Sequence, residues 1–332
     1  MLFGRATRRS QQSDAAEPSS RNLLRRVNRM QLRCASLIDG HLVGGYDSIF
    51  KGEGIEFDET RPYQPGDDVR AIDWRVTARF SRPFVKRFRQ QRQLTVHVLV
   101  DGSASMRMPG TESVHAAESV RAAELVPGAE PIHGDFRTPL DVAREICGVL
   151  IMIAARQQDQ TGLTLFTDRL EHMVEPLSGD NHAARLIGDL VRWKPQGRRT
   201  DLSPPVDRLQ RLARHRSLVV IASDFLSLQD SRQLRALTGL HEVVPVWVSH
   251  STNAAISPCG LLRVQDPETR QVRWLDTNSR RQRASFHAAA AAHRQRVEKI
   301  FSGLGVLPLR VDCQDEVVPC LHRYFDRRGQ LA

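Results

Sequence analysis

The sequence predicts an α/β fold: an open, doubly wound and mostly parallel sheet, preceded by a small β-rich module. From residue 93 onward, strand-like apolar segments alternate with helix-like segments, as in a parallel sheet covered by helices on both faces. Residues 45–93 are instead crowded with turn-forming glycines and prolines. The 332 residues, 40% hydrophobic and 26% charged, are typical of a globular protein with room for about two domains.

The amino-terminal third contains three different patterns. Residues 1–20 are rich in Ser, Arg and Gln without apolar periodicity, which predicts a disordered tail. Apolar residues recur at helical spacing over 22–38, which predicts a basic amphipathic helix. Residues 21–92 are therefore expected to be one helix followed by the β-rich module, in which Asp73-Trp74-Arg75 is expected to form an ion pair beside a buried indole. The strand-like pieces of this module are residues 54–57 and 83–88.

Residues 93–326 are expected to form the sheet domain. Its buried strands are predicted at 94–100, 162–166, 217–222, 242–248 and 306–311. A further strand at 170–176 and a hairpin over 261–275 are expected beside them. The helices are predicted at 139–157, 181–193, 202–213, 231–240, 279–301 and 317–324. The segment 107–138 has no sustained period, which predicts a flexible insertion after the first buried strand.

Composition restricts the functional classes. The net charge of +10 raises the question of nucleic-acid binding, but aromatic residues are only 6% and no recognised nucleic-acid motif occurs. Non-specific binding through the arginine-rich stretches 75–92 and 270–299 stays an alternative, and no specific nucleic acid is predicted as a partner. The five cysteines show no zinc spacing, and the longest apolar run, 149–155, is too short for a membrane helix. A cytoplasmic location without a membrane span is expected.

Oxygen-bearing side chains mark the ends of two predicted strands. Asp101 directly follows the first buried strand, with Ser103 and Ser105 at alternate positions, and Asp224 ends the second central strand. Thr200 lies in a loop before a predicted helix. Ligands of open α/β sheets bind at the carboxyl ends of the strands, and an oxygen-only donor set suits Mg²⁺ or Mn²⁺. Taken alone, the Asp-Gly-Ser-Ala-Ser segment also fits a capped turn between strand and helix.

The five positions Asp101, Ser103, Ser105, Thr200 and Asp224 resemble the metal-ion-dependent adhesion site of von Willebrand factor A domains. The resemblance implies a von Willebrand factor A-like domain whose serines and threonine bind Mg²⁺ directly or through water, with the aspartates acting largely through water. It also implies that an acidic side chain of a partner protein completes the coordination. The site would then bind protein and would not catalyse a reaction.

A second resemblance is carried by an upstream block, Gly52-x-Gly54-x-Glu56-Phe57-x-x-x-Arg61-x-Tyr63-x-Pro65-Gly66-Asp67-Asp68-x-Arg70-x-Ile72-Asp73-Trp74, followed by Thr77-Ala78-Arg79. This block is similar to that of the bacterial domain-of-unknown-function family fifty-eight, and the likeness covers about residues 22–326. It implies a MoxR-type AAA+ ATPase as partner and a chaperone-like adaptor or assembly role toward an unidentified client protein. The chain departs from many members in lacking two membrane helices, and its segment 87–93 is basic where a Glu-rich stretch is expected.

An enzyme is the main alternative. A Mg²⁺-dependent phosphotransfer enzyme would use Asp101 as nucleophile, but such sites need a second acid two residues later, where this chain has Ser103. The sequence also lacks a P-loop and a strand-linked GxGxxG motif for nucleotide binding. We therefore expect an interaction protein that is not an enzyme.

Overall fold

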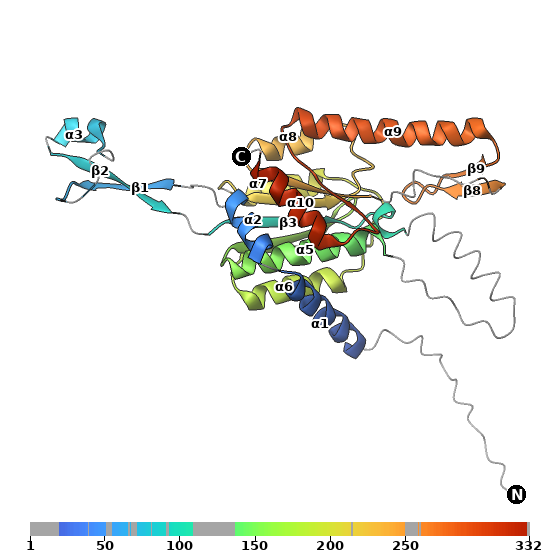
Figure 1. Ribbon diagram of the computed structural model, residues 1–332, viewed down its shortest axis with the longest axis horizontal. Coiled ribbons are helices and arrows are strands. Elements are labelled where there is room, and N and C mark those ends of the chain that lie inside the picture. Colours follow the sequence, from blue (N-terminus) through green and yellow to red (C-terminus); the bar gives the residue numbers. More distant parts are fainter. Residues whose placement is uncertain are drawn as a thin grey trace, which may run out of the picture.

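The centre of the molecule is a six-stranded, mostly parallel sheet of order β10-β7-β6-β3-β4-β5 (Figure 1). The structure, a computed structural model, describes residues 20–108 with gaps at 39, 51–54, 66, 68–71, 81 and 91–92, and residues 137–330 with gaps at 214, 250–257 and 259. Within the sheet, β5 pairs antiparallel with β4 and every other pairing is parallel. The strands are β3 (Thr95–Asp101), β4 (Gln160–Phe166), β5 (Leu170–Leu177), β6 (Leu218–Ser223), β7 (Glu242–Ser249) and β10 (Leu309–Asp312).

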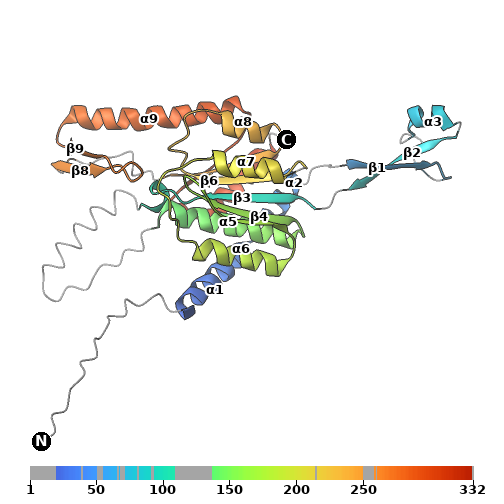
Figure 2. The same cartoon turned by 180° about the vertical axis from the view of Figure 1, so that it is seen from behind.

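Helices cover both faces of this sheet, which confirms the predicted α/β architecture (Figures 1 and 2). One face carries α5 and α6, with α1 (Ser20–Leu37), α2 (Gly40–Phe50) and α10 packed around them, and the opposite face carries α7, α8 and α9. These helices are α5 (Pro139–Arg156), α6 (Asp180–Arg192), α10 (Val317–Gly329), α7 (Ser203–Leu212), α8 (Arg232–Thr238) and α9 (Arg280–Gly303). The expected hairpin is β8 (Leu261–Gln265) paired antiparallel with β9 (Val272–Asp276).

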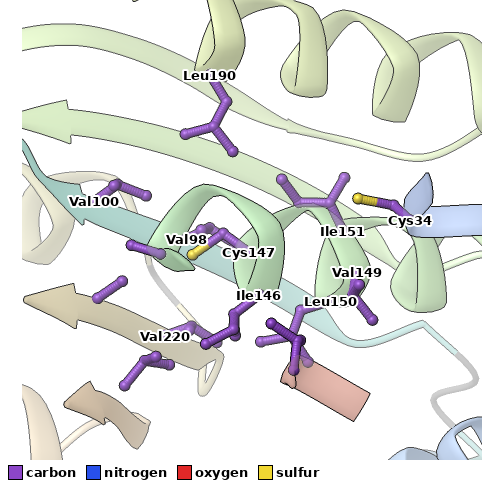
Figure 3. Close-up of a cluster of buried hydrophobic side chains, with 14 of the residues drawn as sticks. Cys34, Val98, Val100, Ile146, Cys147, Val149, Leu150, Ile151, Leu190 and Val220 are labelled. Carbon is purple, nitrogen blue, oxygen red and sulfur yellow. The ribbon is translucent and has the colours of Figure 1, made fainter. Parts of the chain in front are cut away.

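Side chains of the central strands alternate between two apolar cores. On β3, Val98 and Val100 belong to the core under α5, whereas Leu99 belongs to the core under α7 and α8. Figure 3 shows part of the first core, in which Ile146 and Leu150 of α5 lie among strand valines. Each such fully buried aliphatic side chain contributes roughly 1.5–3 kcal/mol relative to an exposed one. The two cores hold the carboxyl ends of β3 and β6 side by side.

The amino-terminal segment differs in part from the expectation. Helix α1 (Ser20–Leu37) matches the predicted amphipathic helix, but residues 40–50, where turns were expected to begin, form helix α2 (Gly40–Phe50). Leu42 and Tyr46 lie one helical turn apart and are fully buried, and the Tyr46 hydroxyl donates to Asp159 Oδ2 at 3.0 Å. Tertiary packing thus overrides the glycines of this segment. Among the described residues, no helix is both long and apolar enough to cross a bilayer.

The β-rich module is a hairpin with one short helix. Strand β1 (Ile55–Pro62) pairs antiparallel with β2 (Phe84–Gln90), and α3 (Trp74–Phe80) lies between them in sequence. The expectation of a buried indole is wrong, because Trp74 is 71% exposed. Asp73 instead accepts hydrogen bonds from the backbone N–H groups of Arg75 and Val76 at the start of α3. The module extends from the end of the sheet where β3 begins, opposite the β8–β9 hairpin (Figure 1).

Two predicted segments lie largely outside the described residues. Residues 1–19 of the expected tail and 109–136 of the expected insertion are among those that the structure does not describe. The two edges of the insertion are ordered: Arg107 ends the short 3₁₀ helix η2 (Ser105–Arg107), and Thr138 and Asp141 form a reciprocal capping box at the start of α5.

Candidate metal centre at the carboxyl edge of the sheet

The five predicted site residues come together at the carboxyl ends of two neighbouring strands. Asp101 ends β3 and Asp224 directly follows β6, and these strands are adjacent and parallel. Asp101 and Ser103 are fully buried, while Ser105 and Asp224 are 9% and 8% exposed. Thr200, from the loop before α7, lies 3.3 Å from Asp101 Oδ2 through its hydroxyl. The topology therefore gathers residues that are up to 123 positions apart in the sequence.

Asp101 uses both carboxylate oxygens. Its Oδ1 accepts the backbone N–H of Ser103 at 2.8 Å, and its Oδ2 accepts the hydroxyl of Ser223 at 2.6 Å. Ser223 is buried and also accepts the backbone N–H of Phe225 at 3.0 Å, so its orientation is fixed. These contacts hold the carboxylate rigidly at the end of β3.

The serine loop after β3 is held by one arginine and one glycine. The Arg107 guanidinium donates to the backbone carbonyls of Ser103, Pro195 and Gly197 at 3.3, 3.1 and 2.7 Å. A Cβ on Gly102 would lie 2.3 Å from Trp193, so the loop needs glycine there. The Ser103 and Ser105 hydroxyl oxygens then lie 3.0 Å apart and face the same side.

Glu171 of β5 positions the loop that carries Thr200. Its carboxylate accepts hydrogen bonds from the Thr167 hydroxyl at 2.8 Å, the Trp193 indole at 2.9 Å and the backbone N–H of Gly197 at 2.8 Å. Burial raises the pKa of Glu171, but the hydrogen bonds prevail and hold the pKa below its usual value. Glu171 is therefore an ionised anchor for Gly197, which lies three positions before Thr200.

The site concentrates negative charge. Burial, reinforced by the nearby negative charge of Asp224, raises the pKa of Asp101. Burial also raises the pKa of Asp224, and the charge of Glu268 adds to the increase, against hydrogen bonds from the Leu226 N–H and Ser105. Among the described residues, no Lys, Arg or His forms an ion pair with any of these three carboxylates. Buried carboxylates without a positive neighbour are costly, and a bound cation would relieve that cost.

Glu268 is a member of this cluster that the sequence did not indicate. It lies in the turn of the β8–β9 hairpin, with Oε1 3.0 Å from the Thr200 hydroxyl and 3.4 Å from that of Ser105. Its Oε2 accepts the hydroxyl of Ser227 at 3.1 Å. Ser223 and Ser227 were also missed, although both flank Asp224 in the segment Ser223–Ser227 and could have been found there. No local sequence pattern indicates that Glu268 belongs to this cluster.

The donor set fits a hard divalent cation. Carboxylate and hydroxyl oxygens are the ligands that Mg²⁺ and Mn²⁺ take, with water filling the remaining positions. Within the described part of the chain, no group of three or more His, Cys, Asp or Glu side chains is placed to hold a metal by itself. An ion here would therefore depend on Ser103, Ser105 and Thr200 as well as on the carboxylates. A pocket of about 210 Å³ adjoins the cluster and is lined in part by Thr200, Ser223 and Ser227.

Fold and site together define an α/β protein with a buried cluster of carboxylate and hydroxyl oxygens at the carboxyl edge of its sheet. The family described as "Protein of unknown function DUF58" matches residues 59–129 and 134–296. The chain belongs to this family, and the predicted family likeness is confirmed.

Two uncharacterized relatives and two solved structures are similar to parts of this chain. An uncharacterized protein of Mycobacterium bovis is 29% identical over 316 residues, covering 92% of this chain and 90% of the relative. An uncharacterized protein of Mycobacterium avium is 36% identical over 142 residues, covering 42% and 83%. The structure of BatB from Bacteroides thetaiotaomicron is similar over 71% of this chain and 99% of its own, at 12% identity and a TM-score of 0.41. An aerotolerance-related membrane protein from Bacteroides fragilis matches 72% and 100%, at 13% identity and a TM-score of 0.42.

Proposed function

We propose that this chain is a metal-dependent protein-interaction protein with a von Willebrand factor A-like site. The observation that carries the proposal is a buried cluster of carboxylates and hydroxyls, at the carboxyl edge of the sheet, that no cationic side chain of the described residues neutralises. In this proposal Mg²⁺ or Mn²⁺ would be held by Ser103, Ser105 and Thr200, with Asp101 and Asp224 acting largely through water. The ion would supply a positive charge that attracts a carboxylate of a partner protein.

The chain's own residues prepare this site before any partner arrives. Ser223 and the Ser103 backbone fix Asp101, Arg107 fixes the serine loop, and Glu171 fixes the loop of Thr200. Rigid, preorganised donors lower the entropic cost of binding an ion and a ligand. The adjoining pocket offers space beside the site for an acidic side chain of the partner.

The proposed partner is a MoxR-type AAA+ ATPase, with the chain acting as adaptor or assembly factor toward a client protein. Support for this step comes from the family likeness alone, and the contacts of the site identify only the chemistry of the partner, an exposed carboxylate. Co-purification with and without a chelator separates metal-dependent capture of the ATPase from indirect association.

The alternative phosphotransfer enzyme has less support. The Asp101 side chain is fully buried, and hydrogen bonds from the Ser103 N–H and the Ser223 hydroxyl hold it in place, which restricts its approach to a phosphoryl group. The position of the second acid is occupied by Ser103, whose hydroxyl lies 3.0 Å from that of Ser105. The geometry favours ion binding over nucleophilic attack.

Calorimetric titration of the full chain with Mg²⁺ and Mn²⁺ tests the proposal. We expect saturable binding that disappears in the double variant Asp101→Ala, Ser103→Ala and persists in Asp180→Asn, an exposed aspartate in the first turn of α6. Equal binding by all three proteins would mean that the ion sits elsewhere, and absence of binding by the unaltered chain would remove the metal from the proposal.

A further inference from the structure

The turn of the β8–β9 hairpin reaches into the candidate metal centre. Glu268 contacts hydroxyls from three separate loops, those of Ser105, Thr200 and Ser227, at 3.4, 3.0 and 3.1 Å. These loops also carry the predicted site residues, so Glu268 lies where they meet. Glu268 therefore brings a carboxylate into contact with the hydroxyl groups of the candidate site.

The turn is built to present this one side chain. Asp266 Oδ1 accepts the backbone N–H groups of Glu268 and Thr269 at 2.9 and 3.1 Å, which closes a tight turn. Arg198, from the loop that also carries Thr200, donates to the Pro267 carbonyl at 3.4 Å. The turn is therefore fixed both internally and against the site.

The available hydroxyl protons are too few for the carboxylates that share them. The single proton of Thr200 serves either Asp101 or Glu268, at 3.3 and 3.0 Å, and that of Ser105 has both the Ser103 hydroxyl and Glu268 within reach. Glu268 also places its negative charge beside Asp224. Such an approach of like charges is unfavourable unless a cation lies between them, in which case the same geometry becomes attractive.

Apolar burial holds the hairpin only weakly. Leu261 and Trp274 are 63% and 64% exposed, and Val264 and Val272 are also exposed. Polar contacts therefore fasten the turn to the site: those of Glu268 with the hydroxyls and that of Arg198 with the Pro267 carbonyl. This arrangement differs from a hairpin that merely packs on the sheet.

We propose that Glu268 is an internal ligand of the metal centre and that the β8–β9 turn competes with the acidic segment of a partner for the same position. The inference rests on the proposed function, because it needs an ion at this site. It assigns the partner's chemistry more narrowly: a protein with a glutamate or aspartate at the tip of an exposed turn, able to replace Glu268. A partner then binds only if its carboxylate displaces Glu268 from the metal centre.

Magnesium titration of Glu268→Gln tests the first half of the proposal. We expect the affinity of the full chain for Mg²⁺ to fall about tenfold, because one charged ligand is lost while the others stay. Glu316→Gln, an exposed glutamate before α10, serves as the matched control and should bind as the unaltered chain does. An unchanged affinity in Glu268→Gln, with binding still lost in Asp101→Ala, Ser103→Ala, would overturn the internal ligand and leave the proposed function intact.

Binding of the turn in trans tests the second half. The probe is a fluorescent peptide of residues 261–276, closed by a disulfide between added terminal cysteines, in versions with Glu or Gln at position 268. In Mg²⁺ we expect the Glu peptide to bind the Glu268→Gln chain about tenfold more tightly than the unaltered chain, since the internal competitor is gone. The Gln peptide should bind neither chain, and the Glu peptide should not bind when a chelator replaces Mg²⁺. Equal binding of the Glu peptide to both chains would refute competition, and loss of Mg²⁺ binding by every protein would refute the proposed function itself.

Discussion

Two of the regions in which this molecule buries carboxylates differ in how the charge is compensated. Glu145 of α5 is 4% exposed and pairs with two arginines, Arg33 of α1 at 3.0 Å and Arg137 before α5. At the carboxyl edge of the sheet, Asp101 and Asp224 are also buried, at 0% and 8% exposed, and the ion pairs of the described residues include neither of them. Glu145 is compensated within the chain, whereas the edge cluster is left with a net negative charge.

The difference separates a structural role from a binding role. The arginines on Glu145 join α1 and the start of α5, which fastens the amino-terminal helix to the domain. The edge carboxylates join no helix pair and are held by serine and threonine hydroxyls. Carboxylates that the fold buries and leaves uncompensated are the ones that favour an external cation.

The largest expected effect is the response of stability to metal. At one hundred times its dissociation constant, Mg²⁺ should raise the free energy of unfolding of the unaltered chain by about 2.7 kcal/mol. Asp101→Asn should lose this gain and be no less stable in EDTA, because a neutral side chain relieves the repulsion with Asp224. Thermal unfolding in Mg²⁺ and in EDTA measures both quantities. A variant that is much less stable in EDTA would make Asp101 a structural residue like Glu145 and break the comparison.

Glu145→Gln should lower the free energy of unfolding whether or not Mg²⁺ is present, and the loss should be smaller than the gain expected from Mg²⁺. Removing one member of a buried pair costs about 3–5 kcal/mol. The arginine side chains are 54% and 30% exposed and can return to water, which reduces our expectation to about 2 kcal/mol. Urea unfolding should show this loss equally with Mg²⁺ and with EDTA. A loss that Mg²⁺ reversed would link α1 to the metal centre and contradict the separation of the two regions.

The sequence was sufficient to predict which site residues lie close together where their positions are determined by the ends of strands. Parallel neighbours finish at one edge of a sheet, so Asp101 after β3 and Asp224 after β6 had to be close once the strands were recognised from their apolar runs. Ser103 and Ser105 follow Asp101 within four residues, and Thr200 lies in the loop before a predicted helix. The structure brings all five together, and their role as metal ligands stays a prediction.

The rest depended on contacts that no local pattern encodes. Glu268 lies 163 positions from Ser105, and its place over the site follows from where a hairpin folds back. Helix α2 was not predicted, and it forms through the burial of Leu42 and Tyr46 against the sheet domain. Glu171 was hidden in the same way, since its function as an anchor requires the loop at Gly197 to return to β5.

Glu171→Gln is expected to give the smallest effect, a change in Mg²⁺ affinity. It tests whether a carboxylate that only positions the site behaves like the edge cluster or like Glu145. An amide can accept fewer hydrogen bonds than the carboxylate, so the loop of Thr200 loosens while both cores stay intact. Outer-shell groups of this kind typically change metal affinity 10–100-fold, and for this partly buried anchor we expect about tenfold weaker Mg²⁺ binding in calorimetry. Glu175→Gln, at an exposed position of the same strand, should leave the affinity unchanged. If Glu171→Gln lowered the free energy of unfolding in EDTA but not the Mg²⁺ affinity, Glu171 would belong with Glu145 among the structural carboxylates.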